Sequence, residues 1–213
     1  MKEILLEIRE LVIGHGNDVL YDKVCLDICE GDCIMLCGAN GSGKTTFLKQ
    51  IAQMGKDITM IPSRIPKVPG FTLKEFIRLT FSIDSRLTEA QEDAISEAMD
   101  RMGLASLADR DISTLSDGEF QKGCIAAALA KKASVILLDE PTAFLDAQNR
   151  VIVLQCLKEI CCPDAGKRPA VIFSTHDLNE GSRVCNKVIA LGADGIFRCS
   201  TENISRTVST IFE

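Results

Sequence analysis

Short apolar runs separated by turn residues dominate the hydrophobic pattern of the chain. Residues 4–10 and 24–30 alternate between apolar and polar positions, which predicts two half-exposed strands. Other runs are short and apolar, as expected of parallel strands that are buried on both faces. They are residues 33–37, 135–138 and 171–173. A further short strand is predicted at 58–61, before Pro62. A closing hairpin is predicted at 187–200, with its turn around Ala193 and Asp194.

The pattern becomes helical from residue 71 to about residue 112. Thr72 with Glu75, and Thr88 with Gln91, have the spacing of capping boxes, which mark helix starts. An apolar stripe follows at helical spacing and is expected to be core rather than binding surface. Its members are Ala94, Ile95, Ala98, Met99 and Met102.

No internal repeat, low-complexity tract or long linker interrupts these elements. The order of strands and helices predicts an α/β fold with a mostly parallel sheet, N-terminal antiparallel strands and an inserted helical subdomain. We therefore expect a single domain over residues 1–213, with the helical subdomain at about residues 71–132.

A glycine-rich stretch, GANGSGKTT at residues 38–46, joins an apolar strand to a helix-like segment and fits the pattern G-x-x-x-x-G-K-[ST]. Glycines let backbone N–H groups turn inward around phosphate oxygens, and the helix that follows directs its positive end at the same anion. Lys44 is expected to reach the terminal phosphates, and the Thr45 hydroxyl to ligate Mg²⁺. The residues expected to bind the nucleotide in this P-loop are Gly38, Asn40, Gly41, Ser42, Gly43, Lys44, Thr45 and Thr46.

Composition narrows the class of protein further. The chain has 213 residues and a net charge of −6, which suits one large α/β domain and argues against nucleic acid as the main partner. Its ten cysteines lack zinc-finger spacing and are expected to be buried reduced thiols, with metal or redox roles as the alternative. The longest apolar run begins at Cys124 and is too short to cross a membrane, and the charged N-terminal segment does not look like a signal peptide.

Two carboxylates, Asp139 and Glu140, follow the apolar run at 135–138. Asp139, at the tip of a strand, can hold Mg²⁺ across from Thr45, and Glu140 is placed to polarise an attacking water. An acidic strand-to-loop transition without chemistry is the alternative. The phosphate loop in the same chain favours the functional interpretation.

The stretch LSDGEFQK at residues 115–122 predicts a second anion site. Ser116 and Gly118 stand at the start of a helix, where backbone N–H groups attract anions. One phosphate loop already covers one side of a nucleotide. A second site has a purpose if it serves the nucleotide of another subunit.

The complete set of motifs resembles the ATP-binding subunit of ABC transporters. GANGSGKTT is similar to the Walker A loop and VILLDE to the Walker B strand. LSDGE is similar to the LSGGQ signature, AFLD at 143–146 to the D-loop and STH at 174–176 to the switch-histidine motif. The five motifs follow the family's order over nearly the whole chain. The forms LSDGE, DEPTAFLD and STHDL are most similar to importers of iron–siderophore complexes, haem and vitamin B12.

The resemblance implies roles for individual residues. Two subunits would pack head to tail, so that the loop at Lys44 of one and the signature of the other hold the same ATP. Glu140 would be the catalytic base, His176 the sensor of the γ-phosphate and Asp146 a nucleotide-side residue of the dimer interface. The signature residues implied to contact ATP are Ser116, Gly118 and Glu119.

The resemblance also implies ligands, partners and a location. ATP and Mg²⁺ are the expected ligands, and hydrolysis would power import of an iron complex, haem or cobalamin. The expected partners are a second, identical ATPase subunit, integral membrane permease subunits that the helical subdomain contacts, and a substrate-binding protein. No nucleic acid is expected, and the protein would lie on the cytoplasmic face of the cell membrane.

Four positions depart from the family's pattern. Ser63 stands where a glutamine usually contacts Mg²⁺ and the attacking water, and its shorter side chain would act only through water. His15 stands where an aromatic residue usually stacks on adenine, and imidazole offers less surface. Asp117 and Glu119 replace glycine and glutamine in the signature, so we expect slightly weaker ATP contact unless neighbouring groups compensate.

Other interpretations remain open at this point. An ABC exporter or a lipoprotein-release ATPase has the same motifs and differs in its neighbouring genes. A soluble ABC ATPase acting on DNA or ribosomes usually carries coiled-coil inserts or two cassettes, which 213 residues do not accommodate. A nucleotide-binding regulator with little hydrolysis is suggested by Ser63 and His15.

Overall fold

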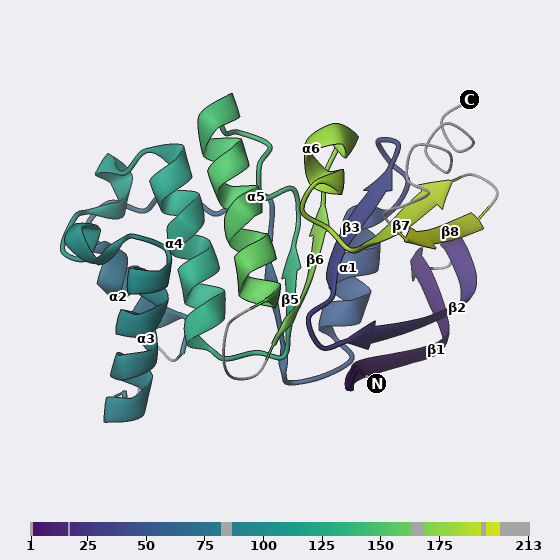
Figure 1. The fold of residues 1–213 in the computed structure, drawn as a ribbon, viewed down its shortest axis with the longest axis horizontal. Coiled ribbons are helices and arrows are strands. Elements are labelled where there is room, and N and C mark those ends of the chain that lie inside the picture. Colours follow the sequence, from purple (N-terminus) through teal and green to yellow (C-terminus); the bar gives the residue numbers. More distant parts are fainter. Residues whose placement is uncertain (1, 17, 82–86, 163–167, 193–194, 201–213) are drawn as a thin grey trace.

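A six-stranded sheet forms the centre of the computed structural model, which describes residues 2–16, 18–81, 87–162, 168–192 and 195–200 (Figure 1). The strand order is β4-β5-β6-β3-β7-β8, and all neighbours pair in parallel except β7 with β8. The strands are β3 (Cys33–Gly38), β4 (Ile58–Ile61), β5 (Val135–Leu138), β6 (Ala170–Ser174), β7 (Lys187–Gly192) and β8 (Gly195–Ser200). Each predicted strand is present, although Ala193 and Asp194 of the predicted hairpin turn lie outside the described residues.

Two long antiparallel strands, β1 (Ile4–His15) and β2 (Asp18–Cys29), form a separate sheet. Both extend beyond the segments that alternation predicts. Their pairing contains register shifts around Glu10 and Lys23, which both have positive φ. Such bulges change which face the following side chains occupy, so a simple period of two ends there although the strand continues.

Six α-helices are described. They are α1 (Lys44–Ala52), α2 (Leu73–Leu79), α3 (Glu89–Arg101), α4 (Asp117–Ala130), α5 (Ala147–Cys161) and α6 (Leu178–Ser182), with short 3-10 turns at Ala105–Leu107 and Ile112–Thr114. The capping boxes predicted at Thr72 and Thr88 are both formed, and the apolar stripe on α3 is buried. Helices α2, α3 and α4 pack together at one end of the molecule (Figure 1).

The sheet separates two apolar cores. Ile34 and Leu36 of β3 face a core shared with α1, β1 and β2, whereas Met35 and Cys37 face the core shared with α4 and α5. Helix α1 therefore covers one face of the sheet and α5 the other (Figure 1). Burial on both faces explains the uninterrupted apolar runs, and the predicted α/β fold is confirmed. The division into one domain with a subdomain at 71–132 stays a prediction.

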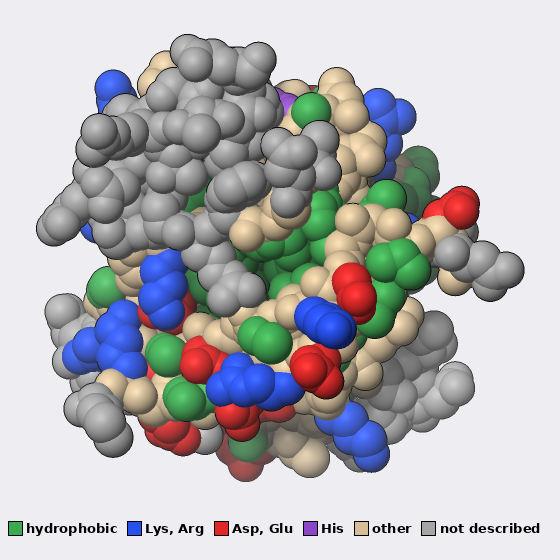
Figure 2. Space-filling model, turned by 90° about the vertical axis from the view of Figure 1, so that its right-hand side faces the viewer, with side chains coloured by type: hydrophobic (Ala, Val, Ile, Leu, Met, Phe, Trp, Pro, Cys, Tyr) green, Lys and Arg blue, Asp and Glu red, His purple; other side chains and the backbone are tan. Residues whose placement is uncertain are grey.

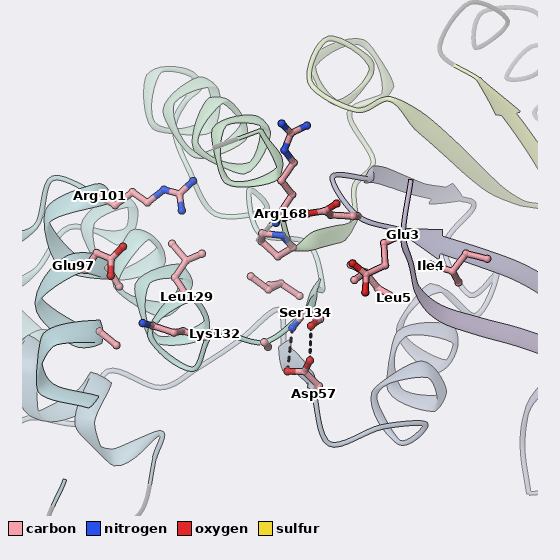
Figure 3. A pocket seen from close by; sticks show the side chains of 16 residues that line it. Glu3, Ile4, Leu5, Asp57, Glu97, Arg101, Leu129, Lys132, Ser134 and Arg168 are labelled. Atoms are coloured by element: carbon pink, nitrogen blue, oxygen red, sulfur yellow. Dashed lines mark hydrogen bonds between the residues drawn. The ribbon is translucent and has the colours of Figure 1, made fainter. Parts of the chain in front are cut away.

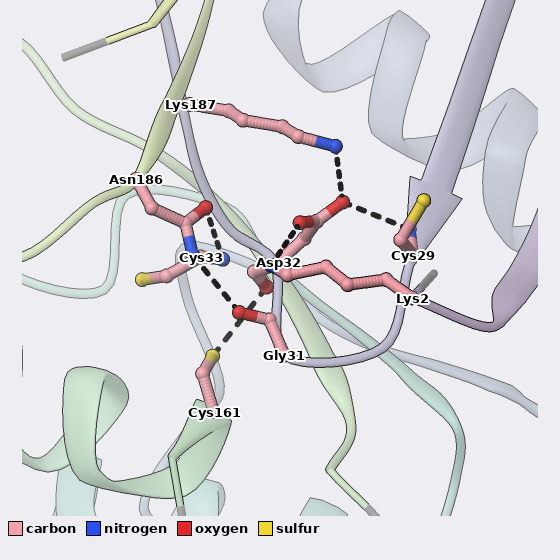
Figure 4. Close-up of polar contacts among 8 residues, drawn as sticks. All are labelled: Lys2, Cys29, Gly31, Asp32, Cys33, Cys161, Asn186 and Lys187. Carbon is pink, nitrogen blue, oxygen red and sulfur yellow. Dashed lines mark hydrogen bonds and ion pairs between the residues drawn. The ribbon is translucent and has the colours of Figure 1, made fainter.

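At the edge where the parallel strands begin, the carboxylate of Asp32 is fully buried (Figure 4). Its Oδ1 accepts from Lys2 Nζ at 3.2 Å, and its Oδ2 accepts from Lys187 Nζ at 2.6 Å and from the Cys29 backbone N–H at 2.8 Å. Two cations and a backbone donor thus neutralise and saturate this buried carboxylate.

The same edge carries an open hollow of about 620 Å³ between the start of β1 and helices α3 and α4 (Figure 3). Asp57 and Ser134 are hydrogen-bonded to each other in its wall. The charged side chains around it, such as Arg101, Lys132 and Arg168, are exposed rather than buried. The hollow is therefore a surface depression with acidic and basic groups mixed around it.

The cysteines behave as small apolar residues for the most part. Of the nine described thiols five are buried, and only Cys162 is exposed. Burial raises the pKa of the Cys124 thiol to about 12, which keeps it protonated and unreactive near neutral pH. Cys199 has no described side chain.

The face over β1 and β2 mixes apolar side chains with charges of both signs (Figure 2). Val12 and Val19 are exposed there, and Arg9 forms ion pairs with Glu7 and Asp27. Within the described part of the chain, no helix is long and apolar enough to span a bilayer.

Candidate active site

The P-loop follows the carboxyl end of β3, and the predicted catalytic residues Glu140 and His176 follow the carboxyl ends of β5 and β6. These strands are parallel neighbours, so their carboxyl ends meet at one edge of the sheet, which is where α/β proteins bind ligands. The three segments that meet there are residues 38–46, 139–140 and 174–176.

The backbone of the P-loop needs glycine at two positions at least. Gly43 has φ of 91°, and a Cβ there would lie 2.7 Å from Leu20 Cδ1. A Cβ on Gly38 would lie 2.5 Å from Ser42 Oγ. At Gly43 the positive φ would strain any other residue, and at Gly38 a Cβ would also lie 2.7 Å from the Leu191 backbone carbonyl oxygen.

The amino end of α1 is free of side-chain caps, unlike every other described α-helix. A side-chain oxygen caps each of α2 to α6, whereas no side chain accepts from the first N–H groups of α1. These groups and the helix dipole are therefore available to an anion from outside the chain.

Lys44 lies at the base of the P-loop, with an ammonium group donating to the carbonyls of Gly38 at 2.9 Å and Ala39 at 3.1 Å. An ammonium has three donors, so one remains for a phosphate oxygen. Burial lowers the pKa of Lys44, and the charges of Glu140 and Asp139 oppose that shift.

Ser42 adds a second polar group without a protein partner. Its hydroxyl oxygen is buried and forms no hydrogen bond with any of the described residues. A buried hydroxyl normally has a partner, and a phosphate oxygen in the loop would supply one. The loop, its lysine and this hydroxyl together fit a nucleotide's phosphates.

Asp139 is 5% exposed and is held by two hydroxyls. Thr45 Oγ1 donates to its Oδ2 at 2.8 Å, and Ser174 Oγ donates to its Oδ1 at 2.9 Å. In the described ranges, no lysine or arginine forms an ion pair with Asp139. A carboxylate beside a hydroxyl provides the hard oxygen ligands that Mg²⁺ prefers, so the donor set fits that metal.

Glu140 lies beside the predicted switch histidine. Its Oε1 is 2.5 Å from His176 Nε2, and its side chain is 28% exposed, so water can reach the carboxylate. The backbone of Glu140 has φ of 50°, which is uncommon for a residue with a Cβ. Its N–H donates to Ser174 Oγ at 2.7 Å.

The signature segment, residues 115–119, forms the start of α4. Ser116 and Glu119 make a capping box, which lowers the pKa of Glu119 chiefly through the Ser116 backbone N–H and then its hydroxyl. Lys67 Nζ lies 2.6 Å from Asp117 Oδ1, and Arg110 lies 4.0 Å from Glu119. Each added negative charge therefore has a cation beside it, and the expected effect on ATP contact stays a prediction.

No hydrogen bond or ion pair joins this signature segment to residues 38–46 in the part of the chain that the structure describes. Gly118 packs against Asn149 of α5, since a Cβ on this glycine would lie 2.5 Å from that side chain. Asp146 caps α5 by accepting from the Asn149 backbone at 2.8 Å. The signature segment therefore packs on the first turn of α5, which Asp146 of the predicted D-loop caps.

The two departures near the nucleotide have different outcomes. Ser63 lines a groove of about 510 Å³ together with Glu140 and Phe144, and its hydroxyl has no partner among the described residues. His15 ends β1 and pairs through its backbone with Asp18, but its side chain lies outside the described residues. The predicted role of each stays a prediction.

Two residues at the site carry no predicted role from sequence reasoning. Tyr21, on β2, donates from its hydroxyl to the Ser42 carbonyl at 2.8 Å and so braces the P-loop. Ser174, at the end of β6, contacts both Asp139 and Glu140. The position of Ser174 two residues before His176 is a signal in the sequence, whereas nothing local marks the contact of Tyr21.

The loop, the hydroxyl–carboxylate pair and the glutamate–histidine pair define a P-loop nucleoside triphosphatase. Residues 21–143 match the family model described as "ABC transporter". The chain belongs to the ABC transporter family and is an ATPase of that family.

Curated relatives match most of the chain. An achromobactin transport ATP-binding protein of Dickeya dadantii is 30% identical over 210 residues, covering 86% of this chain and 77% of that protein. An iron(3+)-hydroxamate import ATP-binding protein of Bacillus subtilis is 30% identical over 214 residues, covering 87% and 78%. A solved metal-chelate type ABC transporter in an inward-facing conformation has a TM-score of 0.87 at 24% identity, covering 100% of this chain and 89% of that chain. At that identity the structural match supports the fold alone.

Proposed function

We propose that this chain is the ATP-hydrolysing subunit of an importer, acting as a head-to-tail dimer that binds two ATP and drives a partner permease. The observation that carries the proposal is the meeting of three groups at one edge of the sheet: Lys44 in its loop, Asp139 with Thr45, and Glu140 with His176. Binding, metal holding and water activation each have a candidate there.

The dimer is supported by the position of the signature segment. Its helix start is a second anion-attracting group, yet among the described residues no hydrogen bond or ion pair joins it to the P-loop of the same chain. A second copy turned head to tail would bring Ser116 and Gly118 to the other side of the nucleotide. The capping box at Ser116 and the ion pairs at Asp117 and Glu119 would orient that surface.

The mechanism assigns a task to each group. Lys44 and the N–H groups at the start of α1 bind and orient the phosphates, and Glu140 takes a proton from the attacking water. His176, in contact with the Glu140 carboxylate, would contact the γ-phosphate and align the two. Mg²⁺, when held by Thr45 and Asp139, supplies positive charge to the phosphate oxygens.

The transported substrate is proposed as an iron–siderophore complex, haem or cobalamin. The name of the iron(3+)-hydroxamate import relative supports an iron complex. A permease in the membrane and a substrate-binding protein complete the proposed system, with this chain on the cytoplasmic face. The helical subdomain at 71–132 would contact the permease.

The deciding experiment is steady-state ATP hydrolysis with Mg²⁺ at increasing concentrations of the purified protein. We expect turnover to rise more than linearly with protein concentration, because two subunits complete each site. Glu140→Gln removes the base and keeps the shape of the side chain, and should abolish turnover while ATP still binds. Unchanged turnover in this variant would rule out Glu140 as the base.

Lys44→Ala tests the binding of ATP rather than its hydrolysis. We expect loss of Mg-ATP binding, measured by equilibrium titration, because the loop loses its buried cation. Undiminished binding would contradict the P-loop assignment. Wild-type protein that binds ATP without turnover, even with a permease present, would favour the regulator suggested by Ser63.

A further inference from the structure

Ser174 is fully buried at the carboxyl end of β6, and one hydroxyl serves two residues of the site. Its oxygen accepts the Glu140 backbone N–H at 2.7 Å and donates to Asp139 Oδ1 at 2.9 Å. The metal-holding carboxylate and the backbone of the catalytic base are therefore linked through a single atom.

The direction of each hydrogen bond is fixed by chemistry. A backbone N–H can only donate, and an ionised carboxylate can only accept, so the hydroxyl must give its one proton to Asp139. Thr45 donates to the other oxygen of the same carboxylate. Two hydroxyls from different elements, α1 and β6, thus set the orientation of Asp139.

Glu140 needs support for a different reason. Its φ of 50° lies in the left-handed region, which costs on the order of 1 kcal/mol or more for a residue with a side chain. Such a conformation persists only when surrounding contacts hold it. The bond from Glu140 N–H to Ser174 is one of these contacts, and it directs the Glu140 side chain toward His176.

We propose that Ser174 is a positioning residue of the ATPase site, whose hydroxyl sets the Asp139 carboxylate for Mg²⁺ and holds the turn that presents Glu140. The inference rests on the proposed function. Ser174 is fully buried and its hydroxyl is bonded to Asp139 and to the Glu140 backbone, so its effect passes through these two residues. Removing the hydroxyl leaves one carboxylate oxygen and one backbone N–H without partners in a buried place.

The test is Ser174→Ala, measured in two ways. Groups that hydrogen-bond a metal-holding carboxylate typically change metal affinity or activity by about 10–100-fold when removed. We expect kcat to fall by roughly that factor, and the Mg²⁺ concentration for half-maximal hydrolysis to rise about tenfold. The second readout is the affinity for a non-hydrolysable ATP analogue, which needs no turnover. In EDTA the affinity of the variant should stay within about twofold of the wild-type value. The increase in affinity on adding Mg²⁺ should be smaller in the variant than in the wild type.

A matched control exists at the other end of β5. Ser134 also donates its hydroxyl to an aspartate, Asp57, and lies just before β5, whereas Asp139 lies just after it. Ser134→Ala removes the same atoms and should leave the Mg²⁺ dependence at the wild-type value. Ser174→Cys keeps nearly the original volume with a weaker hydrogen-bonding group. It should fall between wild type and Ser174→Ala, and it carries the test if the alanine variant does not fold.

Two results would overturn the proposal. One is a Ser174 variant with wild-type kcat and Mg²⁺ dependence. The other is equal loss of analogue affinity with and without Mg²⁺, accompanied by a lower Tm, because that pattern means a general packing role. Failure of the proposed function would give a different result, since the wild-type protein itself would then lack turnover with Mg-ATP.

Discussion

Two buried aspartates lie at opposite ends of the parallel strands, Asp32 just before β3 and Asp139 just after β5. The groups that hydrogen-bond to their carboxylates differ. Asp32 is 0% exposed and is bonded to Lys2, Lys187 and a backbone N–H (Figure 4). Asp139 is 5% exposed and is bonded to the neutral hydroxyls of Thr45 and Ser174. Among the described residues, two lysines bond to the first carboxylate, whereas the groups that bond to the second are neutral hydroxyls.

The difference separates a structural site from a functional one. A buried carboxylate needs opposite charge as well as hydrogen bonds. Asp32 receives both from the chain, so its role is complete on folding. Asp139 receives hydrogen bonds that orient it and lacks an ion pair in the described ranges, which leaves its charge for a cation from solution.

The largest predicted effect is on catalysis at Asp139. Asp139→Asn keeps the size of the side chain and removes its charge. A bound metal contributes several kcal/mol of charge stabilisation, and 1.36 kcal/mol is tenfold in rate, so kcat should fall by about 1,000-fold. The free energy of unfolding should stay the same or rise by up to about 1 kcal/mol, because residues kept for function are often not optimal for stability. Hydrolysis assays and urea unfolding of the same variant measure both.

At Asp32 the opposite outcome is expected. Asp32→Asn leaves two lysines without their counter-charge, and breaking a buried ion pair typically costs about 3–5 kcal/mol of unfolding free energy. Because both lysines are partly exposed, we expect the lower end of that range, measured by urea unfolding. ATP affinity of the folded protein should be unchanged. Weaker ATP binding with unchanged stability would contradict the assignment of Asp32 as a structural and Asp139 as a functional residue.

Lys187→Met is the graded control for this cluster. Lys2 remains beside Asp32 in that variant, so the loss should be smaller than for Asp32→Asn, about 1–2 kcal/mol. An equal loss would mean that Lys187 alone neutralises the carboxylate.

The next prediction concerns the Tyr21 hydroxyl, a neutral donor to the P-loop. Tyr21→Phe removes the bond from the Tyr21 hydroxyl to the Ser42 carbonyl and keeps the ring. Burial raises the pKa of Tyr21, so the hydroxyl remains a donor at neutral pH. One hydrogen bond is worth about 1 kcal/mol, so ATP should bind about fivefold more weakly, measured by equilibrium titration. If affinity does not change, the P-loop is held by its glycines and α1 without this brace.

Local features of the fold and of the site can be predicted from the sequence, because residues close together in the chain determine them. The P-loop, the buried strands and the capping boxes at Thr72 and Thr88 depend on residues a few positions apart. The contacts that distinguish the two aspartates do not. Ser174 is 35 residues from Asp139, and Lys187 is 155 residues from Asp32, so each contact requires the order and register of the strands. The bulges in β1 and β2 likewise break the alternation on which strand limits depend.

The smallest predicted effect tests a partly exposed carboxylate, Glu119, against the two buried ones. Hydrogen bonds from Ser116 lower the pKa of Glu119 in the folded protein, so its charged form stabilises the fold. That stabilisation is present above the unfolded pKa of about 4.3 and is lost as pH falls through the lower folded pKa. Glu119→Gln keeps an acceptor for the capping box and does not titrate.

The difference in unfolding free energy between wild type and Glu119→Gln should therefore favour wild type at pH 7 and shrink toward pH 3. Its size should stay below about 1 kcal/mol, because solvent screens a partly exposed group. Urea unfolding at a series of pH values measures it. A difference that grows as pH falls would mean that the protonated carboxyl is the better cap, and the charge introduced by this signature would then have no stabilising role.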